Sequence, residues 1–263
     1  MIIKDTALVY RRAELCEELR DEKYEIEFDL SHKNIGIGMS GGMDSSLLLW
    51  LLAHHISENE LDVTIYIWTC IHEEKPGQAI HAKKAVAFVK EEFPNVKFGE
   101  HMVRTTTAKD YIANGTKLAY ELVRKYGITA LYNGVTLNPP NEIGEAVWKH
   151  KWETRAMSRN WETRQKWIDS NPQHVDKPSH IEYRPFIHSD KRIVLAFYKK
   201  YGLYVSLGSL TRSCEGFIEM TNYFTETCKE CWWCIEKEWA TADIFNYEPK
   251  VMLDNWVAFT EKH

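Results

Sequence analysis

A glycine- and serine-rich loop between an apolar strand and an apolar helix is the feature of this 263-residue sequence that most constrains its fold. Asn34–Met39 (NIGIGM) predicts a short buried strand, and Asp44–Ile56, with its run LLLWLL, predicts a helix that is apolar on nearly every side. A buried strand that leads directly into a buried helix is typical of sheets covered by helices. We therefore expect an α/β fold.

The same alternation of strands and helices continues beyond this loop. The further predicted strands are Val63–Cys70, Val96–Arg104 and Ile128–Val135, and the further predicted helices are Pro76–Phe93, Thr107–Tyr126 and Asp190–Tyr201. Gly127 and Gly202 follow the last two helices, as glycines commonly do at helix ends. The pattern predicts a doubly wound, mostly parallel sheet with helices on both faces.

The regions outside this alternation suggest three parts. We predict an amino-terminal extension at residues 1–33 and an α/β domain at residues 34–207, with an insertion at about 138–179. A carboxyl-terminal segment at residues 208–263 holds a cluster of cysteines and a final helix.

Charge and hydropathy exclude some classes of function. The net charge of −5 at pH 7 gives no overall field that draws the chain onto nucleic acid or an anionic membrane. The longest apolar run, Leu47–Ile56, is interrupted by two histidines and is much shorter than the ~20 residues of a membrane-spanning helix. The amino terminus has early acidic residues and no long apolar stretch, unlike a secretory signal. We expect a cytoplasmic protein with reduced thiols and no membrane partner.

The glycine-rich loop fits a phosphate-binding role better than two other motifs. Gly36, Gly38 and Gly41 form a G-x-G-x-x-G pattern, but the first two fall in the predicted strand. No acidic residue ends the next strand, as a dinucleotide site requires. A Walker A loop is excluded because no Gly-Lys-Ser/Thr follows. A plain glycine turn with a serine cap needs one polar residue, not four within residues 40–46.

Each residue type in this loop suits an anion. Gly41 and Gly42 let the backbone approach closely because neither carries a Cβ. The helix start adds free N–H groups and a dipole that favour phosphate. Further hydroxyl donors are Ser40, Ser45 and Ser46. Asp44 would repel a bare phosphate, which predicts a Mg²⁺ ion between the carboxylate and the ligand.

Four of the six cysteines form a cluster near the carboxyl end. These are Cys214, Cys228, Cys231 and Cys234. In a reducing compartment such spacing indicates metal before disulfide, and four thiolates complete a tetrahedral, structural zinc site. We expect Cys214 to join the site from the end of a preceding strand. Unbound thiols and a redox or iron–sulfur role are the alternatives, and the roles of Cys16 and Cys70 are left open.

The pattern Ser-Gly-Gly-x-Asp-Ser at residues 40–45 resembles the PP-loop of ATP pyrophosphatases. The resemblance implies a PP-loop (HUP-like) fold and an ATP-using enzyme. In that superfamily the loop holds the β- and γ-phosphates while a substrate oxygen attacks the α-phosphate. Pyrophosphate leaves, and the adenylylated substrate awaits a nucleophile.

Other segments are similar to the 7-cyano-7-deazaguanine synthases of queuosine biosynthesis, over roughly residues 34–240. The matching segments are Gly134-Val135, Pro185-Phe186 ahead of Lys191, Thr211-Arg212-Ser213-Cys214, and the three later cysteines. The spacer between the first and second clustered cysteines is longer than in that family. Residues 136–140 also lack the acidic, tyrosine-bearing stretch of the family's substrate pocket.

The resemblance implies a set of site residues. The implied ATP-binding residues are Met39, Ser40, Gly41, Gly42, Met43, Asp44, Ser45, Ser46 and Gly134. Ser40 and Asp44 of this set, together with Lys191, would be catalytic. Lys191 would lie near the phosphates. The implied cofactors are ATP, Mg²⁺ and Zn²⁺. An exposed lysine at a helix start is the alternative interpretation of Lys191.

These features predict an ATP-dependent carbon–nitrogen ligase or amidase. ATP would adenylylate a small, deazapurine-like carboxylate, ammonia would displace AMP, and a second ATP-driven step could dehydrate the amide to a nitrile. One alternative is a PP-loop enzyme that modifies tRNA or a protein, because Glu145–Asp169 interleaves basic residues with tryptophans. That segment also fits a helix whose tryptophans pack on the sheet. A second alternative is a non-catalytic nucleotide-binding zinc module, and a homodimer is left open.

Overall fold

The structure of this chain is a computed structural model. It describes residues 1–11, 20–73, 77–107, 110–139, 166–214, 221–222, 226–229 and 231–245. Two of the features predicted from the sequence, Cys16 and most of the basic, tryptophan-rich segment, lie outside these residues. Among the described residues, no helix is both long enough and apolar enough to cross a bilayer.

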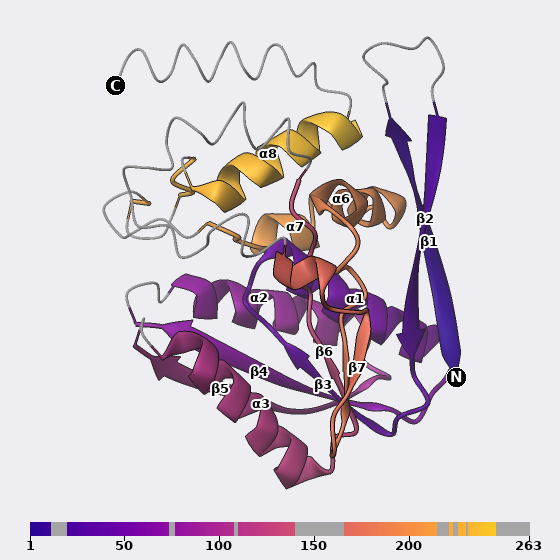
Figure 1. Cartoon of the computed structure of the whole chain (residues 1–263), viewed down its shortest axis with the longest axis vertical. Helices are drawn as coiled ribbons and strands as arrows, with labels where there is room; N and C mark the ends of the chain where they lie inside the picture. The colour runs from indigo at the N-terminus through magenta and orange to yellow at the C-terminus, as the bar shows by residue number, and fades with distance from the viewer. Residues whose placement is uncertain are drawn as a thin grey trace.

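A six-stranded sheet forms the centre of the fold, in the order β5-β4-β3-β6-β8-β7 (Figure 1). Its strands are β3 (Asn34–Gly38), β4 (Thr64–His72), β5 (Lys97–Thr106), β6 (Ala130–Tyr132), β7 (His174–Asp176) and β8 (Ile181–Tyr183). All pairings are parallel except that of β7 with β8. The predicted doubly wound, mostly parallel α/β fold is confirmed.

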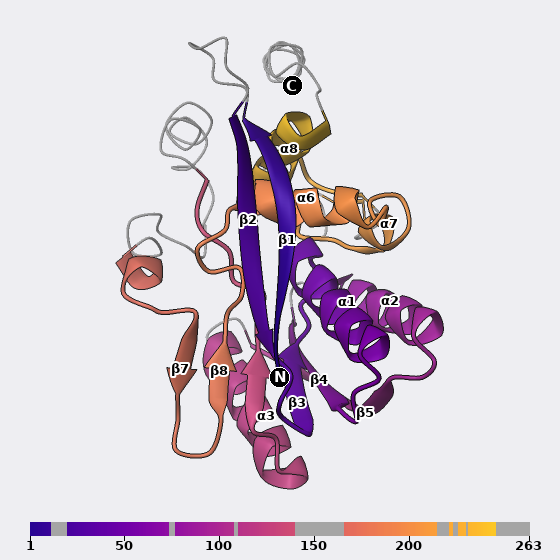
Figure 2. The same ribbon diagram turned by 90° about the vertical axis from the view of Figure 1, so that its right-hand side faces the viewer.

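Helices cover both faces of this sheet (Figures 1 and 2). Helices α1 (Met43–Glu58) and α2 (Gly77–Glu92) lie on one face, and α3 (Tyr111–Tyr126) lies on the other. Helix α1 is buried between the sheet and α6 (Lys191–Lys200), which explains why its sequence is apolar nearly all round. The start of α2 at Pro76 lies outside the described residues.

The amino-terminal extension is a long antiparallel hairpin, which the sequence analysis did not predict. Strands β1 (Ile2–Arg11) and β2 (Arg20–Asp29) pair along their whole length and lie against α6 (Figure 2). Alternate residues Ala7, Val9, Ile26 and Phe28 are buried in the main core. Their period of two was the missed signal, since alternation is the pattern of a strand with one buried face.

Three details of local structure differ from what the sequence indicated. Strand β7 lies in the segment described only as an insertion, and β8 follows it; at three residues each, both are too short for a periodic signal. Strand β6 covers three residues rather than the predicted Ile128–Val135. Cys214 follows a short helix, α7 (Leu207–Leu210), rather than a strand.

Candidate functional site: a pocket at the sheet reversal, beside four cysteines

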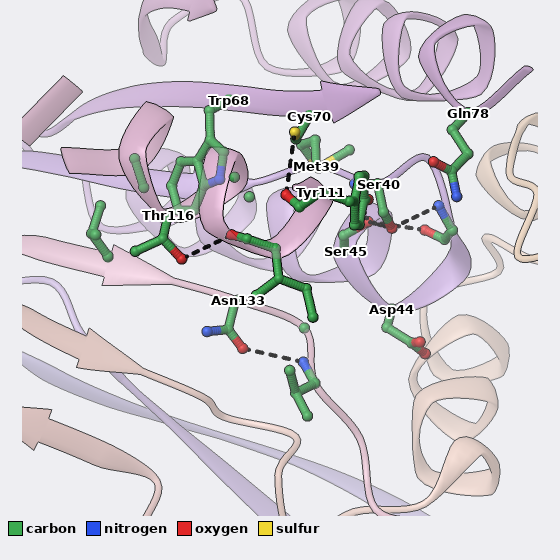
Figure 3. Close-up of a pocket in the computed structure, with 18 of the residues that line it drawn as sticks. Met39, Ser40, Asp44, Ser45, Trp68, Cys70, Gln78, Tyr111, Thr116 and Asn133 are labelled. Atoms are coloured by element: carbon green, nitrogen blue, oxygen red, sulfur yellow. Dashed lines mark hydrogen bonds between the residues drawn. The ribbon is translucent and has the colours of Figure 1, made fainter. Parts of the chain in front are cut away.

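A pocket of about 440 Å³ lies at the carboxyl ends of the central strands (Figure 3). The chain builds β3, β4 and β5 in one direction and then returns to place β6 on the other side of β3. In open α/β sheets, ligands bind outside the strand ends where the strand order reverses in this way. The topology therefore places the loop after β3 at the expected binding position.

Five residues of this loop line the pocket: Met39, Ser40, Gly42, Asp44 and Ser45. In Figure 3, Ser40 and Ser45 lie on one side of the pocket, and Trp68 and Thr116 lie on the other. The side chains of Met43 and Ser46, both expected at the ATP site, instead turn inward and are fully buried. Met43 and Ser46 are three residues apart on α1 and therefore share one face of the helix, which is turned to the core.

Gly41 and Gly134 both lie where the loop is tightly packed against other parts of the protein. Gly41 has φ +78°, and a Cβ there would lie 2.7 Å from both the Ala82 nitrogen and the Gln78 oxygen of α2. A Cβ on Gly134 would lie 2.9 Å from backbone atoms of Asp44. Gly134 does line the pocket, whereas Gly41 lies behind the wall. Because both glycines lack a side chain, other parts of the protein can pack closely against the loop. This role is separate from any contact with a ligand.

The start of α1 is available to an anion. Its N-cap is Gly42, which has no side chain to cap the helix, and the Met43 N–H donates to the distant Ser213 hydroxyl at 3.3 Å. Ser40 and Ser45 bond each other through their hydroxyl groups at 3.1 Å, and the Ser45 hydroxyl donates to the Gly42 carbonyl at 3.2 Å. The serines therefore shape the loop and do not cap the helix, which contradicts the simple serine-cap alternative. Uncapped N–H groups and the helix dipole make this end suitable for phosphate.

Lys191 forms a buried ion cluster with the loop. Its Nζ atom lies 2.6 and 2.5 Å from the two carboxylate oxygens of Asp44, and 3.6 Å from a carboxylate oxygen of Glu236. Lys191 and Glu236 are fully buried, and the Asp44 side chain is 18% exposed at the pocket. The exposed-lysine alternative is therefore wrong. Because Lys191 already neutralises Asp44, the carboxylate alone no longer requires Mg²⁺ beside it.

The four clustered cysteines converge beside the pocket. Their sulfur atoms all lie within 4.8 Å of one another, and Sγ–Sγ distances of 3.9 Å (Cys228–Cys234) and 3.6 Å (Cys231–Cys234) are observed. A tetrahedral site with zinc–sulfur bonds of about 2.3 Å requires separations of about 3.8 Å. The residues therefore fit a four-thiolate metal site.

The four thiols of this cluster interact strongly with one another. Hydrogen bonds from the other three cysteines, that of Cys228 first, lower the pKa of Cys214 far below its usual value. Hydrogen bonding to Cys214 raises the pKa values of Cys231 and Cys234. One thiolate forms easily and its neighbours then resist ionisation. A metal ion supplies the positive charge that four thiolates need.

Cys70, whose role the sequence left open, lies in the pocket wall near the end of β4. Its thiol contacts the Tyr111 carbonyl at a sulfur–oxygen distance of 3.7 Å. Burial raises the pKa of Cys70, so its thiolate, the reactive form, is disfavoured. The site geometry does not mark it as a nucleophile.

Several lining residues were not predicted. Trp68, Asn133 and Glu182 come from β4, the end of β6 and β8, and only the sheet brings them together. Arg212 and Ser213 lie in the segment Thr211–Cys214 that carried the family resemblance, in which only Cys214 was given a role. Among the described lining residues, Arg212 is the only one with a positively charged side chain.

Comparisons with known proteins add little beyond the fold. No family model matches the sequence, and no curated protein matches it. One solved structure that matches is "U34-tRNA thiolase NcsA from Methanococcus maripaludis with its [4Fe-4S] cluster". The two chains share 15% sequence identity and a TM-score of 0.39, over 83% of this chain and 72% of that one. A likeness of this degree does not bear on substrate or cofactor.

Proposed function

We propose that this chain is an ATP-using enzyme of the PP-loop class that transfers AMP to an acceptor and releases pyrophosphate. The observation that carries the proposal is the glycine-capped start of α1, which faces a pocket at the reversal point of the sheet. A triphosphate is the ligand whose charge and size suit that end. The residues 34–207 would then form the ATP-binding domain, and residues 208–263 the metal-binding segment.

The aromatic and apolar side of the pocket suits a nucleoside base. Trp68, Tyr111 and Leu131 line the pocket, and Trp68 lies across it from Ser40 and Ser45 (Figure 3). Flat aromatic surfaces stack bases whatever their sequence context. With the base there, the β- and γ-phosphates would lie at Ser40, Gly42 and the start of α1, and the α-phosphate between the two ends.

The proposed chemistry proceeds by two displacements. A carboxylate oxygen of the acceptor attacks the α-phosphorus, the bond to the bridging oxygen of the β-phosphate breaks, and pyrophosphate leaves. Ammonia then attacks the acyl carbon and AMP leaves, which gives an amide. Loop N–H groups and Ser40 stabilise the charge that develops on the leaving group, and the buried Lys191 acts through Asp44, which it holds in place. Mg²⁺ that enters with ATP would further neutralise the phosphates, with Asp44 as the loop carboxylate closest to them.

We propose a small carboxylate, of the deazapurine type that the sequence motifs suggest, as the acceptor. The end of the pocket at β6 and β8 carries Asn133, Thr136 and Glu182. These amide, hydroxyl and carboxylate groups can bind the N–H and carbonyl edge of a heterocycle. Most of the residues that suggested a tRNA or protein substrate lie outside the described part of the chain. RNA and protein are therefore tested as alternative acceptors in the experiment below.

Pyrophosphate release tests this function. With ATP, ammonium and a deazapurine carboxylate we expect release that depends on the acceptor, and at least about 100-fold less with Asp44→Asn, because such electrostatic groups contribute that much. Asp62→Asn, an exposed aspartate paired with Lys97, is the matched control and should behave as wild type. Ser40→Ala, which leaves the buried ion cluster intact, should lower the rate about tenfold.

Three outcomes would contradict parts of the proposal. Equal rates for Asp44→Asn and wild type would remove the loop from the chemistry. Release only with RNA or a protein would replace the small acceptor with a macromolecule. Bound ATP without pyrophosphate under any condition would indicate a nucleotide-binding module.

A further inference from the structure

The segment before Cys214 lies directly against the phosphate loop. The Arg212 N–H donates to the Gly41 carbonyl at 2.7 Å, and the Met43 N–H donates to the Ser213 hydroxyl at 3.3 Å. Ser213 immediately precedes Cys214 in the chain. The backbone of the loop and the first cysteine of the cluster therefore cannot move independently.

A second connection runs through helix α8 (Trp232–Phe245). Cys234 lies in its first turn, and Glu236 follows two residues later. The fully buried Glu236 carboxylate lies 3.6 Å from Lys191 Nζ, which in turn contacts both oxygens of Asp44. Charges this far from water interact strongly, so the placement of α8 affects the placement of the Asp44 carboxylate.

The two connections enter the loop from opposite ends of the cysteine cluster. One starts beside the first cysteine and reaches the loop backbone through Arg212 and Ser213. The other starts beside the last cysteine and reaches Asp44 through Glu236 and Lys191. A metal ion that draws the four sulfur atoms together would therefore fix both ends of the loop at once.

We propose that metal binding at the four cysteines and nucleotide binding at the loop are energetically coupled, with Glu236 and Ser213 as the positioning residues that carry the coupling. Metal-loaded protein has the loop arranged for nucleotide, and metal-depleted protein binds nucleotide more weakly. Linkage is reciprocal, so nucleotide raises the affinity for metal by the same factor. This inference rests on the proposed nucleotide site but concerns binding and not the acceptor.

The first experiment measures binding in both directions. The full chain, zinc-loaded or treated with a chelator, is titrated with a non-hydrolysable ATP analogue by calorimetry, after circular dichroism has confirmed that both forms are folded. We expect depletion to weaken binding at least about fivefold, the lower end of typical coupling. Transfer of zinc to a chromogenic chelator should be reduced by a similar factor when the same analogue is present.

Variants test the two connections while the metal stays bound. Glu236→Gln and Ser213→Ala keep all four cysteines, so we expect one zinc per chain and analogue binding that is at least about fivefold weaker. Glu238→Gln is the matched control, because it is an exposed glutamate on the same helix. It should bind zinc and the analogue as wild type does. If the chelated protein unfolds, the two metal-loaded variants still test the coupling.

The results separate the two proposals. The coupling is overturned if the analogue binds wild type with the same affinity with and without zinc, and binds Glu236→Gln and Ser213→Ala as tightly as wild type. That result would leave the nucleotide site intact. Zinc-loaded wild type that binds no analogue overturns the nucleotide site and the coupling together.

Discussion

At the residue scale, Gly41 has two separate reasons to lack a side chain. Its φ of +78° is a conformation that L-residues with a Cβ adopt at a cost, and a Cβ would also meet backbone atoms of α2. Gly202 has a similar φ, +66°, with no atom near the position of its Cβ. A comparison of the two glycines therefore separates the energetic cost of backbone strain from the cost of a clash with neighbouring atoms.

We expect Gly202→Ala to destabilise the fold by about 1–2 kcal/mol, the cost of the left-handed conformation alone. Gly41→Ala should cost more than this and should also weaken nucleotide binding, because the loop must move away from α2. Urea unfolding and analogue titration measure the two effects. Equal destabilisation by both substitutions, with unchanged nucleotide binding, would show that the contact between the loop and α2 is not tight.

Lys191 is the second residue whose role depends on its surroundings. Lys191→Met leaves Asp44 and Glu236 without the cation between them, so we expect a loss of about 3–5 kcal/mol in the free energy of unfolding. The double variant Lys191→Met/Glu236→Gln should recover part of this loss. Lys84→Met, an exposed lysine on α2, is the control. A loss below about 1 kcal/mol for Lys191→Met would contradict a buried charge cluster.

At the element scale, the buried carboxylate of Asp5 adds a polar attachment to the apolar packing of the β1–β2 hairpin on the core. Asp5 on β1 accepts hydrogen bonds from Tyr201 at 2.7 Å, Lys200 at 2.5 Å and His55 at 3.1 Å. Burial alone would raise the pKa of Asp5, but these three donors together lower it well below its usual value. The hairpin thus contributes an ionised group to an otherwise apolar interface.

A lowered pKa gives the stability a defined pH dependence. The contribution of Asp5 is fully present above its unfolded pKa, about 3.9, and is lost as the pH falls below that value. We expect Asp5→Asn to be less stable than wild type at pH 7 and to lose less stability than wild type between about pH 4 and pH 2. Urea unfolding across this range checks the difference. Glu92→Gln, an exposed carboxylate on α2, should follow the wild-type curve.

At the scale of the whole molecule, a metal ion would hold together the carboxyl-terminal segment, which contacts the α/β core through Arg212 and Ser213. We expect about one zinc per purified chain, and well under one for Cys228→Ser. Because binding stabilises only the folded form, zinc in thousandfold excess over its Kd should add about 4 kcal/mol to the free energy of unfolding. Cys70→Ser, which lies outside the cluster, should keep its zinc.

Metal analysis and thermal unfolding with and without chelator measure both quantities. Wild type with no bound metal would contradict the site altogether. Iron with acid-labile sulfide in place of zinc would keep the four-thiolate site but contradict the choice of metal.

Local sequence patterns determined the order of elements from β3 to α6 and the position of the loop between β3 and α1. They could do so because burial on a strand or helix leaves a period in the sequence, and because glycines and clustered cysteines have few other uses at such spacing. The hairpin also left its period, in Tyr24, Ile26 and Phe28, although it was overlooked.

Only the tertiary structure decided which groups meet at the site. Lys191 lies 147 residues from Asp44 in the chain, and Arg212 lies still farther from Gly41, yet both pairs are in contact. No local pattern records such contacts, because they depend on which strand ends the crossovers bring together. For the same reason the inward turn of Ser46, the short strands β7 and β8, and the link from Glu236 to the loop became visible only in the folded chain.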